Sequence, residues 1–497
     1  MASKKQVRKK ATTSKREAHD AGEVLDLTAA TAFLKVSKPT FYRWLAQGKV
    51  KGFKAGTQWR FYKRDLEQFL RAEEPSALMV DAGALRAAVQ QARKARGLKP
   101  VEWPKAETAE EATVIGTVNT LIGDAIAAGA SDIHIDVSAD ETLVRYRVDG
   151  VLSEVMSLPR HAAVAIVSRL KLMGDMNISE RRTPQNGRIS VEYQGRDYDL
   201  RVLTMPAIFG ESAICRILDQ GSVLIGMDKL GISKPVRDAL GAKLRAPNGL
   251  LIVTGPAGSG RTTTIYSCLN LINSPKLKIC TIEDPVEYRL RGMMQVHINR
   301  KAGLTFPVAL RSFMRADPDI LMVGGVHDLE TAEGCVNAAM TGHLVLTTML
   351  PLDAPLVVTR LVEMGVEPFL VSSALIAVLA QRLVRRVCPH CAQQHRPPAD
   401  VLPRLEEKTG LDLAGAKLVR GRGCKECQQT GYRSRTGLFE FLQVEGEVRD
   451  LIAKPATTEE LRAAAITSGM TTLLKDGVEK AMQGVTTVEE VMRVLGG

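Results

Sequence analysis

Asn248-Gly-Leu-Leu-Ile-Val-Thr-Gly255-Pro-Ala-Gly-Ser-Gly260-Arg-Thr-Thr-Thr264 is the stretch of sequence that determines the fold. Its apolar run, Leu250 to Val253, predicts a buried strand that leads through a glycine-rich turn into a helix from Ile265 onward. Glycines in such a turn let backbone N–H groups surround phosphate oxygens, and the helix N-terminus adds positive potential. The stretch therefore predicts a phosphate-binding loop.

The spacing of this loop follows the pattern G-x-x-x-x-G-K-[ST] except at one position. Arg261 stands where the pattern has lysine. A guanidinium keeps the positive charge, but its planar fork reaches phosphate oxygens differently from a compact ammonium. The residues predicted to contact the nucleotide are Gly255, Pro256, Ala257, Gly258, Ser259, Gly260, Arg261, Thr262 and Thr263.

Length and composition place the chain among multidomain globular proteins. The 497 residues suggest about three domains. The eight cysteines come without a signal peptide, and no uncharged apolar run reaches the ~18 residues of a membrane span, so we expect a cytoplasmic protein without a transmembrane segment. Residues 1–75 contain 17 Lys and Arg against 8 Asp and Glu, which favours an acidic partner such as nucleic acid for that end.

The basic N-terminal end contains a pattern of helices and strands. Thr28 and Ser37 are suited to cap two successive helices, and strand-like segments follow at 50–53 and 58–62. With Tyr42-Arg-Trp44 and Trp59-Arg-Phe61, the segment resembles the excisionase-like winged helix-turn-helix family. The resemblance implies contacts to DNA from Lys38, Thr40, Tyr42, Arg43 and Arg60. A helix-turn-helix that docks on protein instead remains the alternative.

Further along, family-specific phrases occur in a fixed order. They include Ser131-Asp-Ile-His-Ile135, Glu180-Arg-Arg-Thr-Pro-Gln-Asn-Gly-Arg188, Glu283-Asp-Pro-Val-Glu287 and Thr341-Gly-His343. Over about residues 110–490 the chain closely resembles the type II secretion and type IV pilus assembly ATPases. The resemblance implies an α/β multidomain protein in which a RecA-like P-loop core follows an α+β, PAS-like domain.

This resemblance also implies partners and residue roles. It implies ATP and Mg²⁺ as ligands, Glu283 as the base that activates water, and His343 as a second catalytic candidate. Arg188, Arg201 and Arg216 become candidates for contacts to a neighbouring subunit's phosphates. The implied assembly is a hexameric ring that serves a secretion or pilus machine, peripheral at the inner membrane.

Four cysteines form two C-x-x-C pairs, Cys388 with Cys391 and Cys424 with Cys427. Four thiolates complete a tetrahedral Zn²⁺ site and leave no open position, so the pattern predicts structural zinc. The alternative is four reduced cysteines without metal.

The predicted domain boundaries follow from these motifs. They are a basic tail at 1–21, a winged helix-turn-helix at 22–72, a linker with a helix at 73–110, the α+β domain at 111–225, the RecA-like domain at 226–385, the zinc module at 386–440 and a helical region at 441–497.

Three positions around the predicted reaction centre depart from the family pattern. Gly325 replaces the Walker B glutamate, His327 replaces an arginine, and Leu350 replaces the second histidine of the His box. Together with Arg261, these changes favour a nucleotide-binding pseudo-ATPase with weak or no hydrolysis. An active motor for pilus assembly or secretion, and a DNA-binding regulator that uses the ATPase-like body to sense nucleotide or to oligomerise, are the alternatives.

Overall fold

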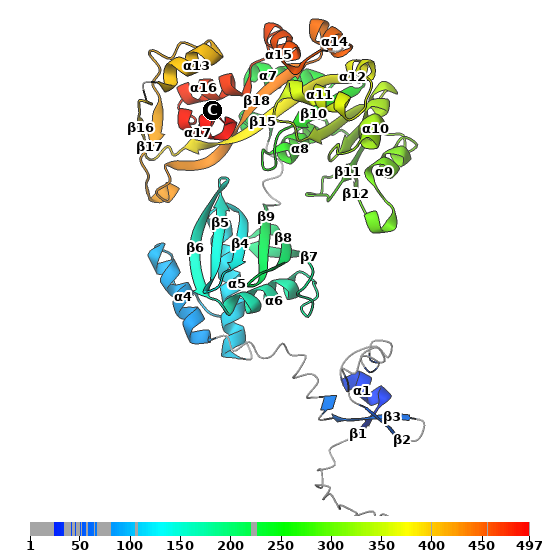
Figure 1. Ribbon diagram of the computed structural model, residues 1–497, viewed down its shortest axis with the longest axis vertical. Coiled ribbons are helices and arrows are strands. Elements are labelled where there is room, and N and C mark those ends of the chain that lie inside the picture. Colours follow the sequence, from blue (N-terminus) through cyan, green and yellow to red (C-terminus); the bar gives the residue numbers. More distant parts are fainter. Residues whose placement is uncertain are drawn as a thin grey trace, which may run out of the picture.

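The computed structural model describes residues 24–33, 41, 45, 50, 52–55, 58–63, 65–66, 81–104, 108–219, 226–398, 400–454 and 456–496 (Figure 1). No helix in these ranges is long and apolar enough to cross a lipid bilayer.

The N-terminal unit is a small antiparallel sheet in the strand order β1-β3-β2 with helix α1. Its elements are β1 (Val24–Asp26), α1 (Leu27–Phe33), β2 (Phe53–Ala55) and β3 (Gln58–Tyr62). The rings of Phe41 and Phe61 meet edge to face at 4.9 Å in its core. Arg60 lies on β3, whereas Lys38, Thr40, Tyr42 and Arg43 lie outside the described residues.

The next unit, called the N-domain below, is a six-stranded antiparallel sheet in the order β6-β5-β4-β9-β8-β7. Its strands are β4 (Ala130–Val137), β5 (Glu141–Val148), β6 (Val151–Pro159), β7 (Gln185–Tyr193), β8 (Arg196–Ala207) and β9 (Gly210–Asp219), and its helices are α4 (Ala82–Ala95), α5 (Ala109–Ala127) and α6 (Ala162–Met173). Residues 133 and 135 of β4 are buried in one core with apolar residues of α4, α5 and α6, so the helices cover one face of the sheet. The alternate positions therefore point to the other face, where the arginines gather.

The body of the protein is a seven-stranded sheet in the order β12-β11-β13-β14-β10-β15-β18. Strands β10 (Gly249–Thr254), β11 (Ile279–Glu283), β12 (Met293–His297), β13 (Ile320–Val323), β14 (Leu344–Met349) and β15 (Leu375–Val387) are parallel, and β18 (Tyr432–Gln443) is antiparallel to β15. Every residue of β10 is buried, which is typical of a central parallel strand. The order and direction of the strands confirm the predicted RecA-like core.

Helices flank this sheet and continue beyond it. They are α7 (Lys234–Lys243), α8 (Arg261–Ile272), α9 (Phe306–Phe313), α10 (Leu329–Met340), α11 (Ala354–Glu363), α12 (Pro368–Ala374), α14 (Gly446–Ile452), α15 (Thr458–Thr467), α16 (Leu473–Met482) and α17 (Val488–Leu495), with short 3₁₀ turns η1 (Met227–Lys229) and η2 (Arg300–Ala302). Helices α14 to α17 pack against the sheet through apolar faces.

The segment between β15 and β18 forms a separate lobe beside the body (Figure 1). It contains β16 (Ala392–Gln394), α13 (Val401–Thr409), β17 (Val419–Gly421) and η3 (Lys425–Cys427), and β16 pairs with β17. Strand β18 returns from this lobe to the main sheet and pairs with β15 over almost its whole length, beyond the predicted RecA-like range of 226–385.

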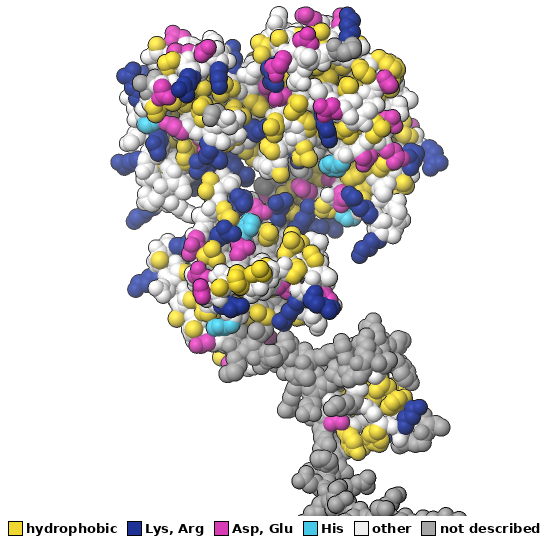
Figure 2. Space-filling model, viewed as in Figure 1, with side chains coloured by type: hydrophobic (Ala, Val, Ile, Leu, Met, Phe, Trp, Pro, Cys, Tyr) yellow, Lys and Arg dark blue, Asp and Glu magenta, His cyan; other side chains and the backbone are white. Residues whose placement is uncertain are grey.

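The N-domain lies against the loop after β11 and the amino end of β18 (Figure 1). Figure 2 shows charged side chains gathered where the two bodies meet. Asp149, in the turn between β5 and β6, accepts a hydrogen bond from the backbone N–H of Ser434 at 3.1 Å and lies 3.5 Å from Arg435. A second contact, from Arg201, is part of the site described next.

Candidate nucleotide site and cysteine centre

The predicted phosphate loop connects β10 to α8 and has the backbone that only glycine accepts easily. Gly255, Gly258 and Gly260 have φ angles of 148°, 77° and 88°. A Cβ atom on Gly255 would lie 2.5 Å from the carbonyl oxygen of Gln381 and 2.7 Å from Oγ of Ser259. Gln381 also donates from Nε2 to the carbonyl oxygen of Ser259 at 2.5 Å, which fixes the loop on β15. The loop is thus shaped by close backbone contacts.

Arg261, the first residue of α8, reaches back across this loop. Its Nη1 donates to the carbonyl oxygens of Gly255 and of Met349, the latter at 2.6 Å. Burial lowers the pKa of the guanidinium from its usual value. The guanidinium of Arg261 therefore links the phosphate loop to the end of β14. This is the group expected to contact a phosphate of the nucleotide.

A cavity of about 150 Å³ lies beside the start of α8. Its lining residues are Thr262, Ile265, Tyr266, Glu283, Asp284, Pro285, Glu287, Arg300, Phe306, Met322, Gly324, His327 and Thr348. Burial raises the pKa of Glu287, whereas the nearby Arg201 and the Thr262 hydroxyl act to lower it. The threonine hydroxyl that would face a Mg²⁺ ion thus lies in the same cavity wall as a carboxylate of the chain.

Glu283 lies at the end of β11 and is only 4% exposed. Its carboxylate accepts hydrogen bonds from the hydroxyls of Tyr266 and Thr281 and, at 3.2 Å, from Nε2 of Gln295. Glu283 and Thr262 both line the cavity. Three donors hold its two oxygens in place.

The end of β13 lacks the expected carboxylate, and a neighbouring ring occupies the space beside this position. Gly325 follows this strand, and a Cβ atom there would lie 2.7 Å from Nε2 of His327. The His327 ring is held edge to face against Phe306 with ring centres 6.5 Å apart. The histidine ring therefore fills the space into which a side chain at 325 would project, so the two departures from the family pattern form one packed unit.

The loop after β14 is also apolar where the family has a histidine. Leu350 and Leu352 are 53% and 57% exposed. The backbone of this loop is held by Thr254, which donates to the carbonyl oxygen of Pro351 at 2.7 Å, and by Arg382, which donates to that of Leu352 at 2.6 Å. The loop is well anchored but offers no ionisable side chain to the cavity from position 350.

His343 lies at the amino end of β14, opposite to the end of the strands beside which the cavity lies. It precedes β14, and its Nδ1 lies 3.0 Å from the carbonyl oxygen of Ala338. The six residues of β14 span about 20 Å, so His343 cannot reach groups at the carboxyl end of that strand. The structure therefore places His343 apart from the cavity that Thr262 and Glu283 line.

The three candidate arginines are on the open face of the N-domain sheet. Arg201 donates to the carbonyl oxygen of Val286 at 3.2 Å and lies 3.7 Å from Glu287, beside the cavity of its own chain. Arg188 pairs with Asp199 and Arg216 with Asp132, at 2.5 and 2.9 Å. Arg201 is thus joined to the cavity within one chain, whereas the other two are held by carboxylates of the N-domain.

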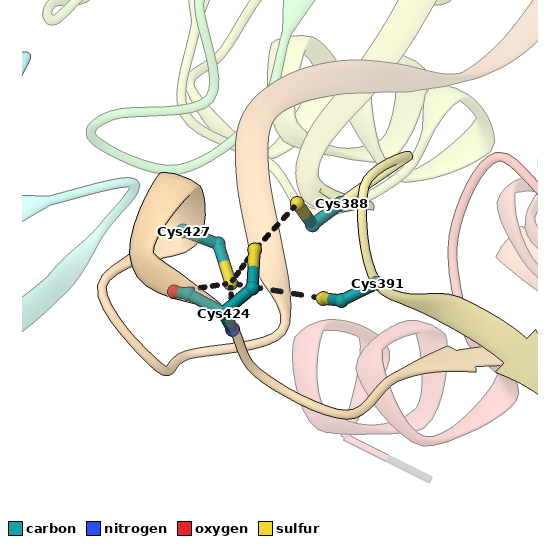
Figure 3. Close-up of side chains that lie close together, drawn as sticks. All are labelled: Cys388, Cys391, Cys424 and Cys427. Carbon is teal, nitrogen blue, oxygen red and sulfur yellow. Dashed lines mark hydrogen bonds between the residues drawn. The ribbon is translucent and has the colours of Figure 1, made fainter.

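The four predicted zinc ligands converge in the lobe (Figure 3). Sulfur–sulfur distances are 3.8 Å for Cys388 to Cys424, 3.8 Å for Cys391 to Cys427 and 3.7 Å for Cys424 to Cys427. A tetrahedral ion with bonds of about 2.3 Å requires sulfur atoms about 3.8 Å apart, so the donor set fits Zn²⁺.

The backbone around Cys427 favours its thiolate, whereas burial raises the pKa of Cys388 and Cys391. Burial raises the pKa of Cys427, but N–H groups of Cys424 and Gly431 donate to its Sγ at 3.2 and 3.3 Å and bring the pKa to about 7. His390 and His395, which lie near these cysteines in sequence, are not part of the group, and His395 contacts Glu489 at 2.8 Å. Below, the cluster of four sulfurs is called the tetracysteine centre.

The fold and the loop together define a P-loop nucleotide-binding protein of RecA type. The family model for the type II/IV secretion system protein matches residues 107–493, and the model for a helix-turn-helix domain matches residues 24–74. The chain belongs to the type II/IV secretion system protein family, and its N-terminal unit is a helix-turn-helix domain.

Similar proteins agree with this assignment. Type II secretion system protein E of Pseudomonas aeruginosa is 44% identical over 389 residues, which are 78% of this chain and 76% of the relative. The type IV pilus assembly ATPase PilB of Thermus thermophilus is 43% identical over 79% of this chain and 44% of its own length. Among solved structures, the pilus retraction motor PilT with bound ADP has a TM-score of 0.52 at 25% identity and covers 75% of this chain and 95% of its own.

Proposed function

We propose that this protein binds ATP in its phosphate loop and hydrolyses it slowly or not at all. The supporting observation is the end of β13, where Gly325 offers no carboxylate and His327 fills the adjoining space. The residues that hold phosphates are separate from this position, because the loop contributes backbone N–H groups and Thr262 from β10 and α8.

Phosphoryl transfer needs a phosphate cradle, a metal anchor, a group that positions water and cations that accept developing charge. Thr262 would hold Mg²⁺, which neutralises phosphate charge when bound. Glu283 would orient water within the cavity. Arg261 and Arg201 supply positive charge, but both already bind backbone carbonyls of the chain. The missing groups are therefore those that stabilise the reaction rather than those that bind the nucleotide.

The size of the expected defect follows from mutational experience. Loss of one group that stabilises a transition state costs about 10²–10³ in rate, and losses that act on one step do not simply multiply. With positions 325, 327 and 350 all changed, turnover should be far below the ~1–10³ s⁻¹ of ordinary enzymes.

One paired measurement tests the proposal. The purified full chain is titrated with ATP to obtain a dissociation constant, and phosphate release is followed at saturating ATP with and without Mg²⁺. We expect saturable binding with little release. Turnover at ordinary motor rates that Glu283→Gln abolishes would instead support an active motor for secretion or pilus assembly.

The helix-turn-helix domain supports a second function, contact with DNA. We propose that it binds double-stranded DNA, because Arg60 lies on β3 and residues 1–75 carry a large excess of positive charge. Binding should weaken steeply with salt. A chain that shows no DNA binding at low salt would favour docking of this domain on a protein partner.

The assembly and location of the protein are also proposals. The family resemblance supports a hexameric ring at the cytoplasmic side of a secretion or pilus machine, in which Arg188 and Arg216 could exchange their carboxylate partners for a neighbour's phosphates. Mass measurement in solution with and without ATP tests the ring. A strictly monomeric protein under both conditions would contradict it.

A further inference from the structure

The lobe around the tetracysteine centre carries a surface of exposed cations. These residues, called the basic face, are Arg386, Arg396, Lys408, Lys417, Arg420, Arg422 and Lys425. All seven are exposed, and within the described part of the chain none forms an ion pair with a carboxylate. The described carboxylates therefore leave the basic face without neutralising contacts.

Three of these cations are fixed to the tetracysteine centre by its backbone. Arg420 lies opposite Gln393 in the pairing of β16 with β17. The N–H of Arg422 donates to the carbonyl oxygen of Cys391 at 3.0 Å, and Lys425 lies between the last two cysteines. Figure 2 shows Lys and Arg side chains along the edge of the lobe that carries β16, β17 and α13. The cations are thus presented by a rigid frame.

The net charge of the lobe remains positive when the tetracysteine centre holds a divalent metal ion. Residues 386–435 contain ten Lys and Arg against five Asp and Glu. Four thiolates with one divalent ion contribute a formal charge of −2, which leaves the segment at +3. Neutralising the cysteine sulfurs therefore does not account for all of these cations, and Lys408 and Lys417 are remote from the sulfurs in sequence.

The neighbours of the basic face distinguish between two kinds of polyanion. Surfaces that insert into lipid bilayers combine cations with exposed Trp, Phe or Leu that enter the headgroup region. Among the described residues from 370 to 465 no large hydrophobic side chain is exposed. The exposed neighbours include four amides, Gln393, Gln394, Gln428 and Gln429, beside the carboxylates Asp400, Glu407, Asp412 and Glu426, which are fewer than the cations. Amides and arginine forks suit phosphate and sugar oxygens of a nucleic acid.

We propose that the basic face binds the phosphate backbone of double-stranded DNA without sequence preference. The inference goes beyond the proposed nucleotide site, and it adds a second contact to the one expected from the helix-turn-helix domain at the other end of the chain. The two surfaces would hold one DNA molecule at separated points. The helix-turn-helix domain would recognise the base sequence, and the basic face would bind the phosphate backbone.

The test compares two triple variants of the full chain that remove the same charge. Arg420→Gln with Arg422→Gln and Lys425→Gln alters the basic face. The control changes three exposed cations elsewhere, Lys276→Gln with Arg315→Gln and Lys454→Gln. Fluorescence anisotropy with a random-sequence duplex is measured over a series of salt concentrations. Zinc content and melting temperature establish that both variants remain folded.

We expect the basic-face variant to lower the slope of log K against log salt by about 2.7, since each phosphate contact contributes about 0.9, and the control to leave it unchanged. Equal slopes for the two variants would overturn the proposal. Loss of binding to anionic lipid vesicles without any change in DNA binding would also overturn it and assign the face to a membrane. Arg60→Gln tests the helix-turn-helix contact separately, so failure of one surface is distinguishable from failure of the other.

Discussion

The tetracysteine centre and the nucleotide site differ in which of their parts are present. At the tetracysteine centre four sulfurs lie within 4.8 Å of one another and match the full ligand set of a structural metal. At the nucleotide site the glycines of the loop are in place, while the ends of β13 and β14 carry a glycine and a leucine instead of ionisable groups. The comparison shows that binding and catalysis have different requirements. Binding a ligand requires correctly placed backbone and side-chain atoms, whereas catalysis also requires charged groups that stabilise the reaction.

The largest expected effect is at the tetracysteine centre. Cys427→Ser should abolish stoichiometric zinc and unfold the lobe, because binding of structural zinc contributes roughly 10–16 kcal/mol in small zinc-binding peptides. Elemental analysis and thermal unfolding measure the change. Cys215→Ser, at a buried thiol of the N-domain, is the control and should keep its zinc. Full zinc content in Cys427→Ser would show that the centre is not a four-thiolate site.

At the phosphate loop, Gly255→Ala should weaken ATP binding by about 10²-fold or more. The new Cβ would collide with backbone of β15 and with Ser259, and the φ angle of 148° adds strain. Gly415→Ala, outside the loop, is the control because its φ is not in the left-handed region and no atom lies within 4 Å of the added Cβ. Calorimetric titration with ATP compares them. Equal affinities for the two variants would mean that packing around Gly255 does not shape the loop.

Restoring the end of β13 should increase turnover on the order of 10²-fold, but only when both residues change. Gly325→Glu alone places its side chain against the ring of His327, so the pair Gly325→Glu with His327→Arg is needed. Phosphate release at saturating ATP is the measurement, and ATP affinity serves as the control for folding. A single Gly325→Glu variant as active as the double variant would contradict the packed arrangement.

A smaller effect is expected at the contact between the N-domain and β18. Asp149→Ala removes the hydrogen bond to Ser434 and the ion pair with Arg435, worth about 1 kcal/mol together. ATP affinity should fall a few-fold because the N-domain is held less firmly over the cavity. Asp140→Ala, an exposed carboxylate on the same domain without a partner among the described residues, should change nothing. Unaltered affinity in Asp149→Ala would show that this contact does not influence the site.

Sequence alone predicted the parts of each site that depend on local spacing. The loop after β10, Glu283 at the end of β11 and the two cysteine pairs are found where their motifs indicate. Such motifs can be recognised in a sequence because residues close together in the chain determine a strand, the turn after it and the start of the next helix. The RecA-like class followed for the same reason.

Other features depend on contacts between distant segments and could not be predicted. Strand β1 pairs with β3, and β18 leaves the cysteine lobe to join the main sheet, as only the folded register shows. The hydrogen bond from the Arg261 guanidinium to the carbonyl oxygen of Met349 depends on where the last residue of β14 lies in the folded chain. His327 and Gly325 are only two residues apart in sequence, but this spacing does not show that the histidine ring lies beside Gly325. The 2.7 Å distance from a Cβ atom at position 325 to Nε2 of His327 follows only from the folded loop.

Strand β15 connects the two sites directly. Gln381 contacts the phosphate loop, and Cys388 lies seven residues later, about 23 Å along the chain. Between them β15 pairs with β18 up to Val387, with a register shift between Arg385 and Val387. If loss of the metal frays this ribbon toward the loop and a nucleotide that tightens the loop opposes the fraying, the two sites are coupled. Thermodynamic reciprocity would then require that ATP raise the affinity of the cysteines for their ion by the same factor by which the ion raises the affinity for ATP. A chelator would therefore act as an antagonist of the nucleotide without ever touching its site.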